Sequence, residues 1–330
     1  CRLGVYHLLS RIVLDRLGWR DRVRIWSPRD DDYFAGLPGG TEIIVFAGVI
    51  ASDLLAQARL DVRPHERVSG ETDAWYQRWQ RELLELVETA AREHGKLGPA
   101  LWHATSGRLF GLPKLLDRAG AELAALRGPG HRPVVELTGE IYLRAVDFSN
   151  DFIVEKLEAR GLQVRLAPMS EWLAYCNHLN RQARGADSVA SRVNHFVQHR
   201  IEGALFGALG RHLGWPVPPG TADVLEVASR YVNPALLGEA VLTVGASLHA
   251  WRRSHIDAVI NIGPLECMPS KIAEAQFHPV ATHEGLLSLS LAFDGNPINT
   301  TTLDNFAFEV HARWQHRRAE KPPKEATLHS

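Results

Sequence analysis

One turn of the sequence places a cysteine where it could do chemistry. The segment GPLECMP follows an apolar run that predicts a buried strand, and a helical pattern begins at its end. Cys267 therefore falls just before a helix N-terminus, with Pro269 suited to the first helical position. The partial positive charge of a helix N-terminus favours the thiolate, the form that binds metal or attacks an electrophile. A buried cysteine that acts as a small hydrophobic residue is the alternative.

The other two cysteines give weaker signals. Cys176 falls inside a helical pattern beside apolar residues, where packing is the better interpretation. Cys1 has no upstream context, and the residues after it run directly into an amphipathic helix, so we expect a chain cut from a longer one. Three cysteines in 330 residues do not make a disulfide framework. This usage predicts a reducing, cytoplasmic setting.

Polar residues follow several of the predicted strands. Glu140 and Arg144 come after one strand, Asn150 opens the next helix, and Asp294 ends the last strand. A carboxylate at such a place could move protons, and a capped helix end could bind an anion. Helix capping and turn formation explain the same residues without a function. We take Glu140 and Asp294 as the candidate catalytic residues.

Histidine offers two further interpretations. His195 and His199 share a helix face, but no H-E-x-x-H and no nearby carboxylate set accompanies them. Solvated or packed histidines are therefore a better interpretation than a zinc site. A thiol enzyme with Cys267 as its nucleophile would need a partnering histidine, and His283 is near it in sequence.

The composition sets broad limits on the class of protein. The chain is 45% hydrophobic and 23% charged, which is typical of a globular protein of about two domains. Its 37 basic and 38 acidic residues give no bulk attraction to nucleic acid or to an anionic membrane. No apolar stretch approaches the roughly 20 residues of a membrane helix. We therefore expect neither nucleic acid nor membrane as a partner.

Strand and helix patterns alternate along the chain. Strands are predicted at 42–48, 132–139, 162–168, 257–264 and 286–295, and helices at 72–95, 149–161 and 301–318. This order predicts an α/β fold with Rossmann-like parallel sheets covered by helices. We place the domain boundary near Gly128. It separates a partial first α/β domain with long helices (1–128) from a second Rossmann-like domain (129–318) and a flexible tail (319–330).

Familiar nucleotide and hydrolase motifs are missing. The sequence has no G-x-G-x-x-G after a strand, no G-x-x-x-x-G-K-[ST] and no G-x-S-x-G. It therefore offers no recognisable dinucleotide cradle, P-loop or nucleophile elbow. In open parallel sheets, ligands bind at the carboxyl ends of the strands. The loops that carry Glu140, Cys267 and Asp294 are the expected site.

Four segments resemble the 2-hydroxyacyl-CoA dehydratase superfamily. They are CRLGVYHLLSRIVLDRLG, TGEIYLRAVDFSNDFIVEKLEARG, GPLECMPSKIAEA and FDGNPINTTTLDNFAFEVHARW. The most similar branch is that of the activase-related, dehydratase D-component-like proteins. The resemblance runs from Cys1 to about residue 318, and its most specific pieces are the G-P-x-x-C-M-P turn and the C-R-x-G start.

This resemblance implies stacked Rossmann-like domains that hold an iron–sulfur cluster, of the [4Fe-4S] or a related type, on cysteine thiolates. Carried over by position, the ligands are Cys1 and Cys267. The family has a further cysteine in an upstream C-L-P-x-K type segment that this chain lacks. Two thiolates do not hold a cubane, so a partial site and a site completed by a missing segment both stay open. The flanking residues expected to contact the cofactor are Gly263, Pro264, Met268 and Pro269.

The resemblance also implies a function. In the family the cluster accepts a low-potential electron from an ATP-dependent activator. True dehydratases pass it to an acyl-CoA thioester and act as lyases, and related branches are similar to ATP-dependent reductases. We expect a cytoplasmic iron–sulfur electron-transfer or dehydratase-like protein that forms a dimer. The alternative is a non-catalytic α/β component of a large CoA-enzyme activase polypeptide.

Overall fold

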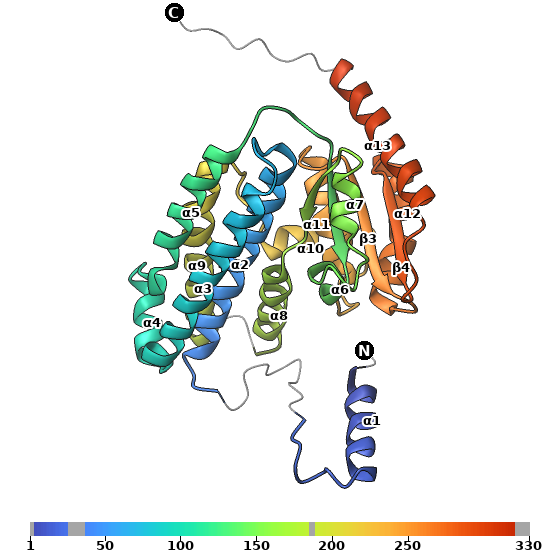
Figure 1. The fold of residues 1–330 in the computed structure, drawn as a ribbon. Coiled ribbons are helices and arrows are strands. Elements are labelled where there is room, and N and C mark those ends of the chain that lie inside the picture. Colours follow the sequence, from blue (N-terminus) through green and yellow to red (C-terminus); the bar gives the residue numbers. More distant parts are fainter. Residues whose placement is uncertain (1–2, 26–36, 185–188, 321–330) are drawn as a thin grey trace, which may run out of the picture.

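The computed structural model describes residues 3–25, 37–184 and 189–320. From residue 37 onwards they form a layer of long helices beside a parallel sheet (Figure 1). The predictions for Cys1 and for most of the tail (321–330) lie outside the described residues.

Four parallel strands form the sheet, in the order β2-β1-β3-β4. The strands are β1 (Val134–Gly139), β2 (Gln163–Leu166), β3 (Ala258–Pro264) and β4 (Ser288–Phe293). The chain leaves β1 towards β2 on one side and later returns to β3 on the other side of β1. A topological switch point therefore lies between the carboxyl ends of β1 and β3, where open α/β sheets bind ligands. The predicted Rossmann-like α/β class is confirmed.

Helices cover both faces of the sheet. Leu137 and Ile260 pack on one face with α6 (Ile141–Ala145), α7 (Ile153–Glu158) and α13 (Thr300–Glu320). Val259 packs on the other face with α8 (Met169–Arg184), α10 (Thr221–Ala228), α11 (Ala240–Arg252) and α12 (Met268–Glu284). Burial on both faces explains why these strands appear as nearly continuous apolar runs.

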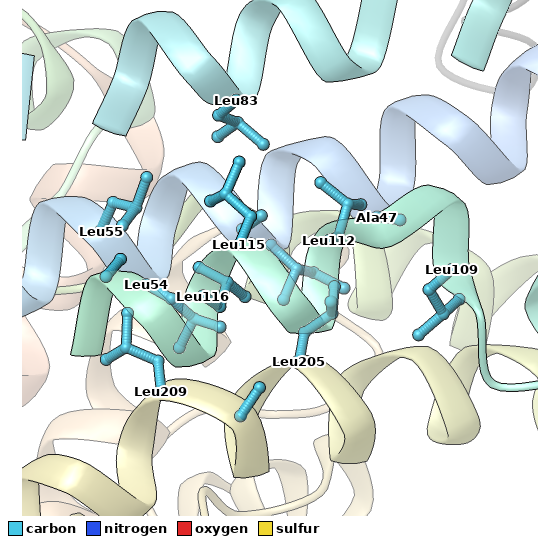
Figure 2. Packing of buried hydrophobic residues seen from close by; sticks show 14 of the residues in the cluster. Ala47, Leu54, Leu55, Leu83, Leu109, Leu112, Leu115, Leu116, Leu205 and Leu209 are labelled. Atoms are coloured by element: carbon cyan, nitrogen blue, oxygen red, sulfur yellow. The ribbon is translucent and has the colours of Figure 1, made fainter. Parts of the chain in front are cut away.

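The helical layer has its own apolar core. It is built from α2 (Thr41–Val62), α3 (Glu71–His94), α4 (Leu97–Thr105), α5 (Leu112–Leu126) and α9 (Val189–Leu213), with short 3-10 turns at Arg63–His65 and Leu109–Gly111. Figure 2 shows Leu55 of α2, Leu116 of α5 and Leu209 of α9 in this core. All three side chains are fully buried, so leucine packing between helices holds the layer together.

The predicted strand at 42–48 is wrong, because this segment lies in the first two turns of α2. The helix is buried on several sides, so its apolar residues do not show the spacing of an amphipathic helix. A short apolar run cannot be told from a buried strand by its periodicity. The described part of residues 1–128 contains no strand. The domain division at residue 128 stays a prediction, although α9, from beyond it, packs in the same core as α5.

Among the described residues, one helix is long and apolar enough to span a membrane. It covers Thr41–His65 with a mean hydropathy of 1.7, which corrects the expectation that no apolar stretch approaches this length. Half of that stretch is buried against the rest of the chain. The core position of α2 is therefore compatible with a soluble protein.

Polar contacts fasten the helical layer to the edge of the sheet. The N–H of Leu166 in edge strand β2 donates to Gln57 Oε1 of α2 at 2.9 Å. Asp61, also in α2, accepts from Gln163 Nε2 of β2 at 2.7 Å and from Trp215 Nε1 at 3.0 Å. The open edge of β2 is thus covered by a helix, which protects it from pairing with another chain.

Candidate functional site

The switch point brings Glu140 and Cys267 into one neighbourhood. Glu140 follows β1, and its backbone N–H donates to the carbonyl of Ile262 in β3 at 2.8 Å. Cys267 occupies the N-cap position of α12, shortly after β3. The carboxylate of Glu140 is close enough to raise the pKa of the Cys267 thiol. Two residues 127 positions apart in the sequence therefore meet at the carboxyl edge of the sheet.

Gly263 lets the first turn of α12 lie directly on the end of β3. A Cβ at this position would be 2.3 Å from Ser270 Oγ and 2.5 Å from Ser270 Cβ, so glycine is required for this approach. Asn261 Nδ2 donates to the carbonyl of Ser270 at 3.1 Å and holds the turn in place. The backbone N–H of Ser270, in the same turn, lowers the pKa of the Cys267 thiol.

The backbone just before Cys267 is strained. Glu266 has a φ of 61°, in the left-handed region that residues other than glycine rarely adopt. On the neighbouring loop after α6, Asp151 and Phe152 also have positive φ, at 55° and 53°. Such conformations cost about 1–3 kcal/mol each and cluster at functional sites.

The thiol of Cys267 ionises less readily than an ordinary cysteine. Burial raises its pKa, the carboxylates of Glu140 and Glu239 raise it further, and the N–H of Ser270 lowers it. The backbone at the helix N-terminus favours the thiolate, as expected, but burial and the two carboxylates outweigh it in the described surroundings. A thiol that stays protonated at neutral pH is a poor nucleophile, so the site does not favour a thiol enzyme.

Removing a neighbouring carboxylate should make this thiol more reactive. We expect Glu239→Gln to accelerate the alkylation of Cys267 by iodoacetamide several-fold near pH 7.5, because the neutral amide no longer opposes the thiolate. The rate is measured by mass spectrometry with Cys1 and Cys176 replaced by serine. The exposed Glu226→Gln is the control and should leave the rate unchanged. Equal rates in all three proteins would show that Glu239 does not influence the thiol.

A buried arginine ties the strand ends together beneath the loops. Arg144 is 5% exposed, and its guanidinium donates to the carbonyl of Gly139 at 3.0 Å and to that of Pro168 at 3.1 Å. It also lies 3.6 Å from Glu239 Oε1. Arg144 therefore links the ends of β1 and β2 to the loop that precedes α11.

Three buried carboxyl groups surround this arginine. Glu136, Glu171 and Glu239 each have a buried oxygen without a hydrogen-bond partner. Burial raises the pKa of Glu171 and that of Glu239 to about 7, and it also raises the pKa of Glu136. The charge of Arg144 lowers the pKa of all three groups and so opposes these shifts. The charge of Arg165 does the same for Glu171 and Glu136. Two arginines face three carboxyl groups, so the cluster can hold and release a proton near neutral pH.

The two candidate catalytic carboxylates have different surroundings. Glu140 Oε2 accepts from the N–H of Leu143 at 2.8 Å and so caps α6, while the residue stays close to Cys267. Asp294 lies one strand further along the edge, beside a hollow of about 250 Å³. Hydrogen bonds from the backbone and side chain of Asn296 lower the pKa of Asp294. Its carboxylate is thus engaged in its own turn.

The described residues place one cysteine at this edge, because Cys1 lies outside them and Cys176 is on α8. They include no group of three or more His, Cys, Asp or Glu residues that could hold a metal ion. The four residues expected to contact a cofactor flank Cys267 at the strand end: Gly263, Pro264, Met268 and Pro269. Of these, Gly263 is buried, whereas Pro264 and Met268 are exposed.

The histidine interpretations gain no support. The rings of His195 and His199 lie edge to face on α9 with centroids 4.2 Å apart, and both residues are exposed. Among the described residues they belong to no metal-binding group. His283 lies in the last turn of α12, about 24 Å from Cys267 by the rise of the helix. It does not pair with the thiol.

Sequence reasoning missed the buried carboxyl groups. Glu136 gave a signal, since it interrupts the apolar run of β1, where a charged residue must find a partner. Glu171 follows β2 closely, whereas Glu239 comes from a loop far away in sequence. Only the tertiary fold shows that they share Arg144.

Fold and site together define a Rossmann-like α/β protein with a cysteine and buried acidic groups at the switch point of its sheet. No family model, curated protein or solved structure matches the chain.

Proposed function

We propose that this chain is a cytoplasmic iron–sulfur protein similar to the 2-hydroxyacyl-CoA dehydratases, and that Cys267 supplies one cluster ligand. The observation that carries the proposal is the position of Cys267. Cys267 is the N-cap residue of α12, beside the switch point of the sheet, and the backbone N–H of Ser270 in the same turn lowers the pKa of its thiol. N–H donors to sulfur stabilise anionic clusters and tune their potential.

The described residues supply only part of a cluster site. One thiol is present at the edge, and a cubane is held by four. The remaining ligands would have to come from Cys1, which is outside the described residues, or from another polypeptide. The family resemblance names an ATP-dependent activator as the electron donor and an acyl-CoA thioester as the substrate. A dimer is likewise part of the proposal.

The residues of the chain have definite tasks under this proposal. A cluster, when bound, supplies the low-potential electron. Ser270 stabilises the thiolate of Cys267, and Gly263 allows the two residues to meet at the strand end. Glu239 holds a proton beside the sulfur, since burial raises the pKa of this carboxyl to about 7. Arg144 keeps Glu239 in place.

Iron binding tests the proposal directly. The chain is incubated anaerobically with ferrous iron and sulfide, desalted, and assayed for iron, sulfide and visible absorption. We expect the unaltered chain and Cys176→Ser to bind iron and sulfide alike, and Cys267→Ser to lose most of both, because the thiolate is the ligand that iron–sulfur clusters require. Equal iron in the unaltered chain and Cys267→Ser would contradict a role for Cys267 as a ligand.

A non-catalytic component of an activase polypeptide is the second candidate. The observation in its favour is that the described residues contain no group of three or more metal-binding side chains. The same reconstitution distinguishes the two candidates. If neither the unaltered chain nor Cys176→Ser retains iron after desalting, the chain contributes a surface and not a cluster.

A further inference from the structure

Exposed apolar side chains gather on the loops at the carboxyl edge of the sheet. We name this surface the strand-end rim. It consists of Tyr142, Phe148, Phe152, Leu237, Leu265 and Met268, each between 50% and 85% exposed. Hydrogen bonds join the loops: the N–H of Leu265 donates to the carbonyl of Phe293, and that of Ile298 to Asp151 Oδ2. Exposed apolar side chains on neighbouring loops are typical of an interaction site.

The same loops are acidic. Segments 139–152, 233–239, 264–271 and 294–299 contain six acidic and two basic residues. Arg144 and its partner Glu239 lie beneath the rim, with side chains 5% and 13% exposed, which leaves five acidic residues and Lys271. A partner for the rim should therefore be apolar and basic.

Helix α1 (Leu3–Arg16) has both properties. Its apolar residues Val5, Leu8, Leu9, Ile12 and Val13 share one helix face, and each is between 41% and 58% exposed. Residues 3–25 contain five arginines and two aspartates. The helix is therefore an amphipathic element with an unpartnered apolar face and a net positive charge.

Alone, α1 would not be stable. An isolated helix of this length is marginal in water, and most helices in proteins are stabilised by packing of their apolar face. In Figure 1, α1 stands apart from the other helices, below the ends of the strands in this view. The exposed face of α1 and the strand-end rim are thus two unpartnered apolar surfaces of opposite charge in one chain.

We propose that α1 is a strap that closes over the strand-end rim of its own chain and covers the loop that carries Cys267. The 24 residues between Arg16 and Thr41 can span about 80 Å when extended, so the tether allows this closure. Binding within one chain is favoured over binding to a second copy, because the tether raises the effective concentration of the helix. The proposal does not depend on an iron–sulfur cluster.

Cross-linking tests the closure. Leu9→Cys on the apolar face of α1 is combined with Met268→Cys on the rim, in a full-length chain whose own three cysteines are replaced by serine. We expect a short bismaleimide to join the two cysteines within one chain, detected as a linked peptide pair at monomer mass. Arg11→Cys, on the polar face of α1, is the matched control and should form several-fold less of the link. All cluster ligands are absent from this background, so the result is independent of iron.

Hydrogen exchange gives a second readout. Leu9→Asp should increase the exchange of peptides covering 140–152 and 264–270 several-fold, whereas Ser10→Asp, with the same charge on the other face, should not. A cross-link found only at dimer mass would overturn closure within one chain and assign α1 to a second copy. Equal linking by Leu9→Cys and Arg11→Cys would overturn it as well. A third outcome would assign the helix to a membrane surface. In that case the unaltered chain binds anionic phosphatidylserine vesicles and Leu9→Asp does not, while Leu9→Asp leaves the hydrogen exchange of the rim peptides unchanged.

Discussion

Arg144→Met is expected to lower the free energy of unfolding by about 3–5 kcal/mol, because removing one partner of a buried ion pair leaves the other charge uncompensated. The guanidinium donates to two strand-end carbonyls and faces the buried Glu239 and Glu171. Methionine fills similar space but leaves these carbonyls without a donor. Urea denaturation at neutral pH measures the loss, and near-UV circular dichroism checks that the variant has the same tertiary packing.

Two comparisons separate this effect from general damage. Arg92 is an exposed arginine on α3, and Arg92→Met should change stability by less than about 0.5 kcal/mol. The double variant Arg144→Met with Glu239→Gln should recover at least about 1 kcal/mol relative to Arg144→Met, since the uncompensated carboxylate is gone. Strictly additive losses would show that Arg144 and Glu239 do not interact.

Glu171→Gln is expected to stabilise the protein increasingly as the pH rises. Burial is the main reason why the pKa of Glu171 is raised from 4.5 to about 7. The folded state then binds a proton that the unfolded state has released, so ionisation destabilises the fold as pH increases from 4.5 to about 7. Between about pH 5.5 and about pH 8, the stability of Glu171→Gln relative to the unaltered chain should rise by about 2 kcal/mol.

Thermal or urea unfolding at several pH values measures this difference. Other groups also make stability depend on pH. Arginine partners lower the pKa values of Asp117 and Glu284, so these groups stabilise the fold as the pH rises. Comparing the variant with the unaltered chain cancels their contributions. The exposed Glu226→Gln should show a pH-independent difference near zero. A constant offset for Glu171→Gln across the pH range would mean that its carboxyl group titrates normally.

The strands of the sheet could be predicted because their signals are local. Each combines a short run rich in apolar residues with turn residues at its end, and all four predicted segments from 132 onwards contain a strand. Segment 42–48 has the same local signal, yet it is a helix. This segment forms a helix because the apolar residues continue to Val62 and because other helices pack around it.

Parts of the candidate site could also be predicted from the sequence. The position of Cys267 between a strand and a helix follows from the sequence, and so does the placement of Glu140 after a strand. The raised pKa of the Cys267 thiol could not be predicted from the sequence. Its pKa depends on burial and on Glu239, which comes from a loop almost 30 residues earlier in the chain.

The sequence by itself determined the α/β class, the location of the four strands and the loops on which polar residues lie, because periodicity and turn chemistry act over short distances. Only the tertiary structure decided which loops meet. The strand order makes β1 and β3 neighbours, so Glu140 and Cys267 share one edge, and three buried carboxyl groups come to share Arg144. Electrostatic interactions between such groups depend on the distance between them and on their burial, and the local sequence determines neither the distance nor the burial.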